Sequence, residues 1–155
     1  MRVRIREFFP DDFESLWRID QECFAPGIAY SRRELLHYLK RPGAFTYLAE
    51  RDGTSEIAGF IVVEHDTRRA IGHVITLDVV ADARRHGVGS ALMKAADERL
   101  LKAGCKAVYL ETAIDNTPAI QFYRRHGYTV LNVIPRYYKR KLDAFRMGKL
   151  LEVPA

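Results

Sequence analysis

The segment that decides the fold lies in the middle of the chain, where residues 75–90 read ITLDVVADARRHGVGS. Its first half is rich in β-branched and aliphatic residues, which predicts the end of a strand that begins near Ala70. The residues after Gly89 repeat apolar side chains at helical spacing and predict a helix to about Ala103, stopped by Gly104. A glycine-rich turn therefore connects a strand to the N-terminus of a long helix, which is typical of anion-binding loops.

The turn itself, residues 84–90, has the chemistry of a phosphate site. The first turn of a helix leaves backbone N–H groups without partners, and the helix dipole adds partial positive charge there. Gly87 and Gly89 carry no Cβ atom, so an anion can approach the backbone closely, and Arg84 and Arg85 add positive charge. The alternative interpretation is a glycine-rich turn that holds no ligand.

Two well-known nucleotide motifs are excluded by single residues. A P-loop requires Lys and then Ser or Thr after its last glycine, but Ser90 and Ala91 follow Gly89. The dinucleotide fingerprint requires a third glycine three residues after Gly89, where Leu92 stands.

The rest of the chain predicts alternating strands and helices without repeats or linkers. Ser31 and Glu34 form a capping-box pattern at the start of one helix. Strands are predicted over residues 3–6, 45–50, 57–64, 70–80, 108–112, 128–134 and 144–151, and further helices begin near residues 10, 31 and 117. This order predicts an α/β (α+β) fold, with a mixed sheet of six or seven strands flanked by about four helices, in one domain over residues 1–155.

Composition narrows the class of partner. The 155 residues carry a net charge of +5, which suits an anionic ligand. The basic residues are scattered and no recognition-helix motif is present, so we expect no direct nucleic-acid binding. No apolar run approaches the roughly 18–20 residues of a membrane span. We therefore expect no membrane association. Cys23, Cys105 and the five His residues show no metal-ligand spacing, so we expect no bound metal. The two cysteines are expected to be reduced thiols in a cytoplasmic protein.

Two segments at this separation resemble a known family. The pattern R-x-x-G-x-G at residues 84–89 and the segment LETAIDNTPAIQFYRRHGY at residues 110–128 resemble the GNAT superfamily of acetyl-CoA-dependent N-acetyltransferases. The resemblance covers essentially the whole chain and implies acetyl-CoA as the cofactor. It implies that the loop amides hold the pyrophosphate, that the backbone of residues 77–79 pairs with the pantetheine arm, and that Asn116 contacts the cofactor. The cofactor-binding residues implied in this way are Leu77, Asp78, Val79, Arg84, Arg85, His86, Gly87, Val88, Gly89, Ser90, Asn116 and Tyr123.

Two residues are candidates for proton transfer. Glu111, near the end of a predicted strand, is the candidate general base, acting directly or through water; the alternative is a solvated strand-end carboxylate. The resemblance places a general-acid tyrosine at Tyr123, which would protonate the departing thiolate; the alternative is an aromatic ring that packs with Ile120. The resemblance also assigns the N–H of Val79 to polarising the thioester carbonyl.

Two segments, residues 24–30 and residues 137–144, indicate which amine is acetylated. Tyr137-Tyr138, followed by Asp143-Ala144, resembles the protein N-terminal acetyltransferases, which include the enzymes that acetylate an N-terminal alanine of a ribosomal protein. Phe24, Pro26 and Tyr30 resemble the peptide-binding loop of that branch, here lengthened by residues 27–29. The substrate-binding residues implied are Phe24, Pro26, Tyr30, Tyr137 and Tyr138.

The expected acceptor is therefore the N-terminus of a protein or peptide, with a ribosomal protein among the candidates. Physical chemistry agrees, because an α-amine has a pKa of about 7.7–8.0 whereas lysine has about 10.4, so deprotonating lysine costs roughly 3–4 kcal/mol more. Two alternatives stay open. One is acetylation of a small amine, such as a polyamine, an amino acid or an antibiotic, and the other is a CoA-binding regulatory domain without turnover.

Overall fold

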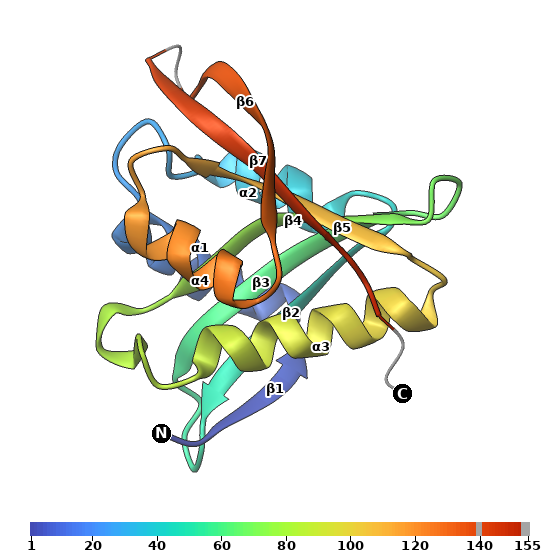
Figure 1. Ribbon diagram of the computed structural model, residues 1–155. Coiled ribbons are helices and arrows are strands. Elements are labelled where there is room, and N and C mark those ends of the chain that lie inside the picture. The colour runs from blue at the N-terminus through green and yellow to red at the C-terminus, as the bar shows by residue number, and fades with distance from the viewer. Residues whose placement is uncertain (139–140, 153–155) are drawn as a thin grey trace.

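The computed structural model describes residues 1–138 and 141–152, which form one central sheet with helices on both faces (Figure 1). The strands of the described part are β1 (Val3–Glu7), β2 (Ala44–Arg51), β3 (Ile57–Asp66), β4 (Ile71–Val79), β5 (Ala107–Ala113), β6 (Thr129–Tyr138) and β7 (Leu142–Leu150). Its α-helices are α1 (Phe13–Cys23), α2 (Arg32–Lys40), α3 (Val88–Lys102) and α4 (Thr117–Arg125), and short 3-10 turns precede α1 and α3.

The sheet has seven strands in the order β1-β2-β3-β4-β5-β7-β6. Every neighbouring pair is antiparallel except β4 and β5, which are parallel and are connected through α3. This confirms the predicted mixed sheet, the hairpin between β2 and β3, and the strand–helix–strand unit that the glycine-rich turn defines.

Two hydrophobic cores lie on opposite faces of the sheet. The larger core contains Leu92, Ala96 and Leu100 of α3 together with Tyr123 of α4. The smaller core contains Leu16 and Ile19 of α1 and Leu35 of α2. In Figure 1, α3 and α4 accordingly lie in front of the sheet, and α1 and α2 lie behind it. None of the helices in the described part is long and apolar enough to cross a bilayer.

The parallel pair at the centre of the sheet separates after a short contact. Its ladder joins only residues 71–73 of β4 to residues 107–109 of β5. Beyond this point the two strands are no longer paired, so the last residues of β4 keep a free hydrogen-bonding edge. The loop that leads to α3 begins just after this free edge.

A β-bulge in β4 changes which face its side chains reach. Val62 of β3 pairs with Thr76, but the next residue pairs with Val74, so Ile75 is the extra residue. A bulge reverses the alternation of side chains along a strand. Val74 therefore joins the core under α3, whereas Asp78 is turned toward α1.

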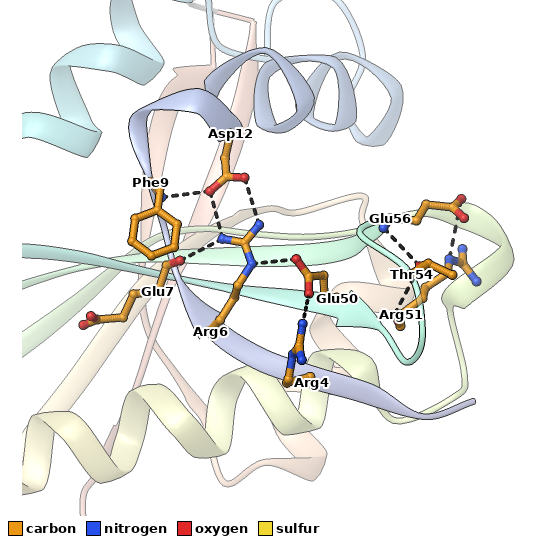
Figure 2. Close-up of polar contacts among 9 residues, drawn as sticks. All are labelled: Arg4, Arg6, Glu7, Phe9, Asp12, Glu50, Arg51, Thr54 and Glu56. Atoms are coloured by element: carbon orange, nitrogen blue, oxygen red, sulfur yellow. Dashed lines mark hydrogen bonds and ion pairs between the residues drawn. The ribbon is translucent and has the colours of Figure 1, made fainter.

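The start of the chain is fastened by a network of charges (Figure 2). Arg6 donates to both carboxylate oxygens of Asp12, each at 2.9 Å, and through Nε to Glu50 at 2.7 Å. Arg4 binds the other oxygen of Glu50 at 2.5 Å. The hydrogen bonds from Arg6 and Arg4 hold the pKa of Glu50 below its usual range. The network connects β1 to β2 and to the turn before α1, and thereby fixes where α1 begins.

The element boundaries differ from the sequence prediction mainly in β6. The prediction ended this strand at Ile134 because Pro135 follows, but the strand continues to Tyr138. Proline is tolerated here because β6 is the last strand of the sheet, so the missing N–H is not needed by a neighbour. The capping box of Ser31 and Glu34 at the start of α2 is confirmed.

Candidate active site

The free edge of β4 presents the backbone of Leu77 and Val79. The N–H of Val80 donates to the carbonyl of Ala58 on β3 at 2.9 Å. Peptide groups alternate in direction along a strand, so those of Val79 and Leu77 point the other way, toward the gap beside β5. The backbone of Asp78 points back to β3. Of the three residues predicted to pair with the pantetheine arm, two therefore face the gap.

The carbonyl of Val79 already has two partners at this edge. Cys23 Sγ donates to it at 3.4 Å, and Arg84 Nε donates to it at 3.0 Å. Arg84 is thus folded back onto the end of β4, whereas the backbone of Arg85, His86 and Gly87 continues as an exposed loop. The Arg84 side chain therefore binds the backbone at the end of β4.

The loop before α3 has the backbone geometry that an anion requires. Arg85 and Gly87 both have positive φ, 64° and 81°. The first intrahelical bond of α3 runs from Ala91 N–H to Gly87 O, and Gly87 supplies no capping side chain. The N–H groups of residues 88–90 therefore have no partner within the helix. A Cβ built on Gly87 meets no atom within 4 Å, so the space over this backbone is open.

The far side of the loop is held by α4. Ser90 Oγ lies 2.9 Å from Nε2 of His126, whose Nδ1 lies 2.9 Å from the carbonyl of Phe122. A carbonyl only accepts, so Nδ1 carries a proton, and Nε2 shares a hydrogen bond with the Ser90 hydroxyl. A Cβ on Gly89 would come within 3.1 Å of the Phe122 ring. A side chain at Gly89 would therefore press against the Phe122 ring, whereas the absence of one at Gly87 leaves the backbone accessible.

The substitution Gly87→Val is expected to weaken acetyl-CoA binding by at least about tenfold, or ~1.4 kcal/mol, because the side chain would fill the open space over the loop. Isothermal titration calorimetry with acetyl-CoA measures the change. Gly53→Val is the matched control, since Gly53 also has positive φ (78°) and open space around its Cβ position but lies in the β2–β3 hairpin. Equal affinity of the two variants would contradict the phosphate-loop assignment.

Glu111 lies in β5 and is almost completely buried, with 6% of its side chain exposed. Its Oε1 is 2.6 Å from Nε2 of His73, and its Oε2 accepts from Nε of Arg146 at 2.9 Å. Burial alone would raise the pKa of this carboxyl, but His73 and then Arg146 outweigh burial and lower it. Glu111 is therefore a fixed anion with two cationic or proton-donating neighbours, not a solvated strand end.

The sheet register explains how these side chains meet. Glu111 of β5 lies directly opposite Arg146 of β7, and His73 of β4 lies opposite Tyr109 of β5. The His73 and Tyr109 rings are stacked at 4.2 Å between centroids, and the Arg146 guanidinium lies 5.4 Å from the centre of the Tyr109 ring. The sequence did not predict His73, Tyr109 and Arg146 as site residues, because only the register across three strands brings them near Glu111.

The tyrosine pair at the end of β6 lies beside this carboxylate, and tyrosines of two other segments lie near the pair. The Tyr137 hydroxyl is 3.5 Å from Glu111 Oε1, and its ring packs edge-on against Tyr138 at 4.8 Å. Tyr30, from the loop after α1, packs against Tyr38 of α2 at 5.2 Å and donates from its hydroxyl to the carbonyl of Ile75 at 3.3 Å. Burial raises the pKa of Tyr137 to about 12, and the neighbouring Glu111 anion acts in the same direction.

Of the predicted substrate-binding residues, Tyr137 and Tyr138 lie near Glu111, and Tyr30 lies near the tyrosine pair. Phe24 and Pro26 lie in the same loop as Tyr30, where Phe24 is half-buried and Pro26 is exposed. Arg136, just before the tyrosine pair, has a positive φ of 53°, and its N–H donates to Asp143 at 2.9 Å. The regular pairing of β6 with β7 is interrupted here, just before the tyrosine pair.

Tyr123 lies on the other side of β5, in α4. It is 9% exposed, and burial, followed by the nearby Asp78 carboxyl, raises its pKa. Its phenol therefore keeps its proton at neutral pH, as a proton donor must. Asn116 caps the same helix by accepting from Ala119 N–H at 3.3 Å, which leaves its amide N–H groups as the part available to a ligand.

The assembled geometry fits the cofactor that the sequence analysis implied. The loop before α3 has N–H groups without partners in the helix, the end of β4 is not paired with β5, and Tyr123 of α4 supplies a buried phenol. Comparison with known proteins agrees, because the Acetyltransferase (GNAT) family matches residues 13–128 of this chain. The chain belongs to this family, and it is an acyltransferase whose acetyl donor is acetyl-CoA.

Individual relatives cover nearly the whole chain. An uncharacterized N-acetyltransferase of Methanocaldococcus jannaschii is 33% identical over 147 residues, which make up 94% of this chain and 90% of the relative. An N-alpha-acetyltransferase of Sulfurisphaera tokodaii is 28% identical over 156 residues, with 94% and 91% covered. The crystal structure of Ard1 from Thermoplasma volcanium matches with a TM-score of 0.85 and 30% identity, over 99% of this chain and 100% of that one.

Proposed function

We propose that this acetyltransferase acts on the N-terminal α-amine of a protein or peptide. The observation that carries the proposal is the buried Glu111 carboxylate beside the tyrosine pair at the end of β6, with Tyr30 of the loop after α1 near that pair. Aromatic rings beside a fixed anion suit a positively charged chain end flanked by a peptide backbone. The similarity to an N-alpha-acetyltransferase supports the same acceptor.

Glu111 and His73 are proposed to receive the amine. The Glu111 anion attracts the incoming ammonium group, whose proton must leave before the nitrogen can attack. An α-amine loses this proton at a pKa of about 7.7–8.0, so only a modest driving force is needed. The His73–Glu111 pair, directly or through one water molecule, is the proposed route for the proton.

Val79 and Tyr123 are proposed to act on the donor. When bound, acetyl-CoA supplies a thioester whose carbonyl carbon is open to attack by the amine. The N–H of Val79 faces the gap and is the proposed hydrogen-bond donor to the carbonyl oxygen, where negative charge develops. Tyr123, buried and protonated, is the proposed donor of the proton that the departing thiolate takes up. The general base Glu111 and the general acid Tyr123 are thus both part of this proposal.

The partner and the compartment follow from the same proposal. The acceptor is a protein N-terminus, with a ribosomal protein as one candidate. Cys23 and Cys105 are both free thiols, which suits the reducing conditions of the cytoplasm.

The acceptor is tested by measuring thiol release from acetyl-CoA with three sets of substrates. The sets are short peptides with free α-amines, peptides with a blocked N-terminus and one lysine, and small polyamines. We expect turnover with the first set only, because its amines are the easiest to deprotonate at neutral pH. Turnover with polyamines but not with peptides would instead assign the protein to small-amine acetylation, and tight binding of acetyl-CoA without turnover on any set would support a regulatory domain.

A further inference from the structure

Two buried carboxyl groups, to which the proposed function assigns no role, lie between α1 and β4. Asp20 of α1 is completely buried, and Asp78 of β4 is 1% exposed. Their carboxyl groups are within hydrogen-bonding reach of each other. No lysine or arginine forms an ion pair with either carboxyl in the described part of the chain.

Each carboxyl group has one oxygen that is satisfied and one that is not. Asp20 Oδ2 accepts from the N–H of Tyr30 at 2.7 Å, and Asp78 Oδ1 accepts from the hydroxyl of Thr76 at 2.6 Å. Asp20 Oδ1 and Asp78 Oδ2 are buried and receive no hydrogen bond from any described residue. Two ionised carboxylates in contact would leave both oxygens unsatisfied and would repel each other. One proton held between these two oxygens satisfies both.

We propose that Asp20 and Asp78 share one proton in the folded protein, and that this protonated pair positions the acceptor loop against the strand that receives acetyl-CoA. The contact joins the two halves of the site. Asp20 holds the backbone of Tyr30, one of the tyrosines of the acceptor side, and Asp78 lies between Leu77 and Val79, which face the donor gap. The positioning role rests on the proposed function, whereas the shared proton does not.

The surroundings of the pair favour the protonated state. Burial raises the pKa of both carboxyl groups. The titratable or charged groups that face the pair are Tyr30 from the loop, Glu34 from α2, Cys23 from α1, Arg84 from the loop before α3 and Tyr123 from α4. Arg84 is the one cation among them, and its Nε is already bonded to the carbonyl of Val79.

The shared proton predicts how stability changes with pH. A carboxyl whose pKa is raised on folding stabilises the protein at low pH, and this contribution is lost as pH rises from the ordinary range near 4 up to the raised value. In Asp78→Asn the amide N–H replaces the proton and does not titrate. As pH rises through this window, the wild type should therefore lose stability and the variant should not. The unfolding constant of the wild type, divided by that of the variant, should rise about tenfold per pH unit.

Urea unfolding of both proteins between pH 4 and 8 measures this ratio. Asp20→Asn makes the same replacement from the other side and should give the same trend. Infrared spectroscopy of the wild type at neutral pH gives a second readout, because a protonated carboxyl has its own carbonyl band, which should disappear in Asp78→Asn. Parallel pH curves together with absence of that band would overturn the shared proton.

The positioning role is tested with Asp20→Ala and its conservative partner Asp20→Asn. We expect Asp20→Ala to raise the acceptor KM about tenfold, as for the loss of one charge-assisted hydrogen bond, while the dissociation constant of acetyl-CoA changes less than twofold. The Tyr30 amide should exchange with deuterium faster in the same variant. Asp20→Asn, whose amide oxygen can still accept from Tyr30, should restore both readouts. Unchanged amide exchange and acceptor KM in Asp20→Ala would overturn the positioning role.

These readouts separate the inference from the proposed function. If no peptide is a substrate but the pH trend, the infrared band and the Tyr30 exchange behave as expected, the choice of acceptor is wrong and the paired carboxyls remain. If peptides are acetylated but these three readouts fail, the inference is wrong and the proposed function remains.

Discussion

Tyr123→Phe is expected to lower kcat by about 10²-fold while acetyl-CoA affinity stays within twofold of wild type. General-acid catalysis contributes typically 10²–10⁴-fold. A thiolate is a better leaving group than an alkoxide and needs less assistance from an acid, so we expect the lower end of that range. The hydroxyl is removed without changing the ring, which packs 5.7 Å from Tyr128 and 5.5 Å from Phe122. Stopped-flow thiol release under saturating substrates measures kcat directly.

The matched control is Tyr128→Phe, which removes a neighbouring phenol oxygen. Tyr128 is 2% exposed, and its hydroxyl receives and donates no hydrogen bond among the described residues. Removing a buried hydroxyl that has no partner should leave activity unchanged and should not lower stability. If Tyr123→Phe keeps nearly full turnover, the thiolate takes its proton from water or from another group. If both variants lose activity equally, the effect lies in helix packing and not in proton transfer.

Glu111→Gln is expected to lower kcat/KM by about 10²-fold over the whole range from pH 6 to 9. A glutamine amide offers one acceptor oxygen in place of two, so His73 and Arg146 can no longer both donate to this side chain in their present positions. The variant also lacks the negative charge that attracts the acceptor ammonium. Initial rates with a free-α-amine peptide at several pH values measure the effect.

The shape of the pH profile tests the role of Glu111 further. The pKa of Glu111 lies below its usual range, so the carboxylate stays ionised from pH 6 to 9 in the wild type. The rise of activity with pH in that range should therefore follow deprotonation of the α-amine, near 7.7–8.0, rather than of Glu111. An unchanged rate and profile in Glu111→Gln would show that the residue is not part of the proton route.

Glu50→Gln is the control for losing a buried carboxylate that pairs with arginine. Glu50 lies on β2 and binds Arg6 at 2.7 Å and Arg4 at 2.5 Å, neither of which belongs to the proposed acceptor or donor residues. The variant should retain wild-type kcat/KM. A comparable loss in this control would indicate that weakening the sheet, and not removing the site anion, reduces activity.

Much of the fold was predictable because its signals are local. The capping box before α2, the glycine that ends α3 and the hairpin between β2 and β3 each act within a few residues of the chain. The same holds for the anion-binding loop, whose N–H groups belong to consecutive residues. Such features form wherever the same short sequence meets the same backbone conformation, so the loop before α3 could be expected from the sequence alone.

The partners of Glu111 could not be predicted in this way. His73 and Arg146 lie 38 and 35 residues from it along the chain, on two different neighbouring strands. Which residues face each other depends on the register of both pairings, and register is set by packing on the sheet faces and not by any single strand. The sequence therefore indicated a carboxylate, and the sheet determined that it is a buried, doubly bonded anion.

The bulge residue Ile75 determines the face of the sheet on which the Asp78 side chain lies. Strict alternation from Val74 would place Asp78 under α3. The bulge at Ile75 reverses the alternation and brings the Asp78 carboxyl to Asp20. By itself, the sequence determined the elements, their order and the glycine-rich loop before α3, because these depend on neighbouring residues. Tertiary structure alone decided which charged side chains meet, because those contacts depend on how three strands and two helix layers are aligned.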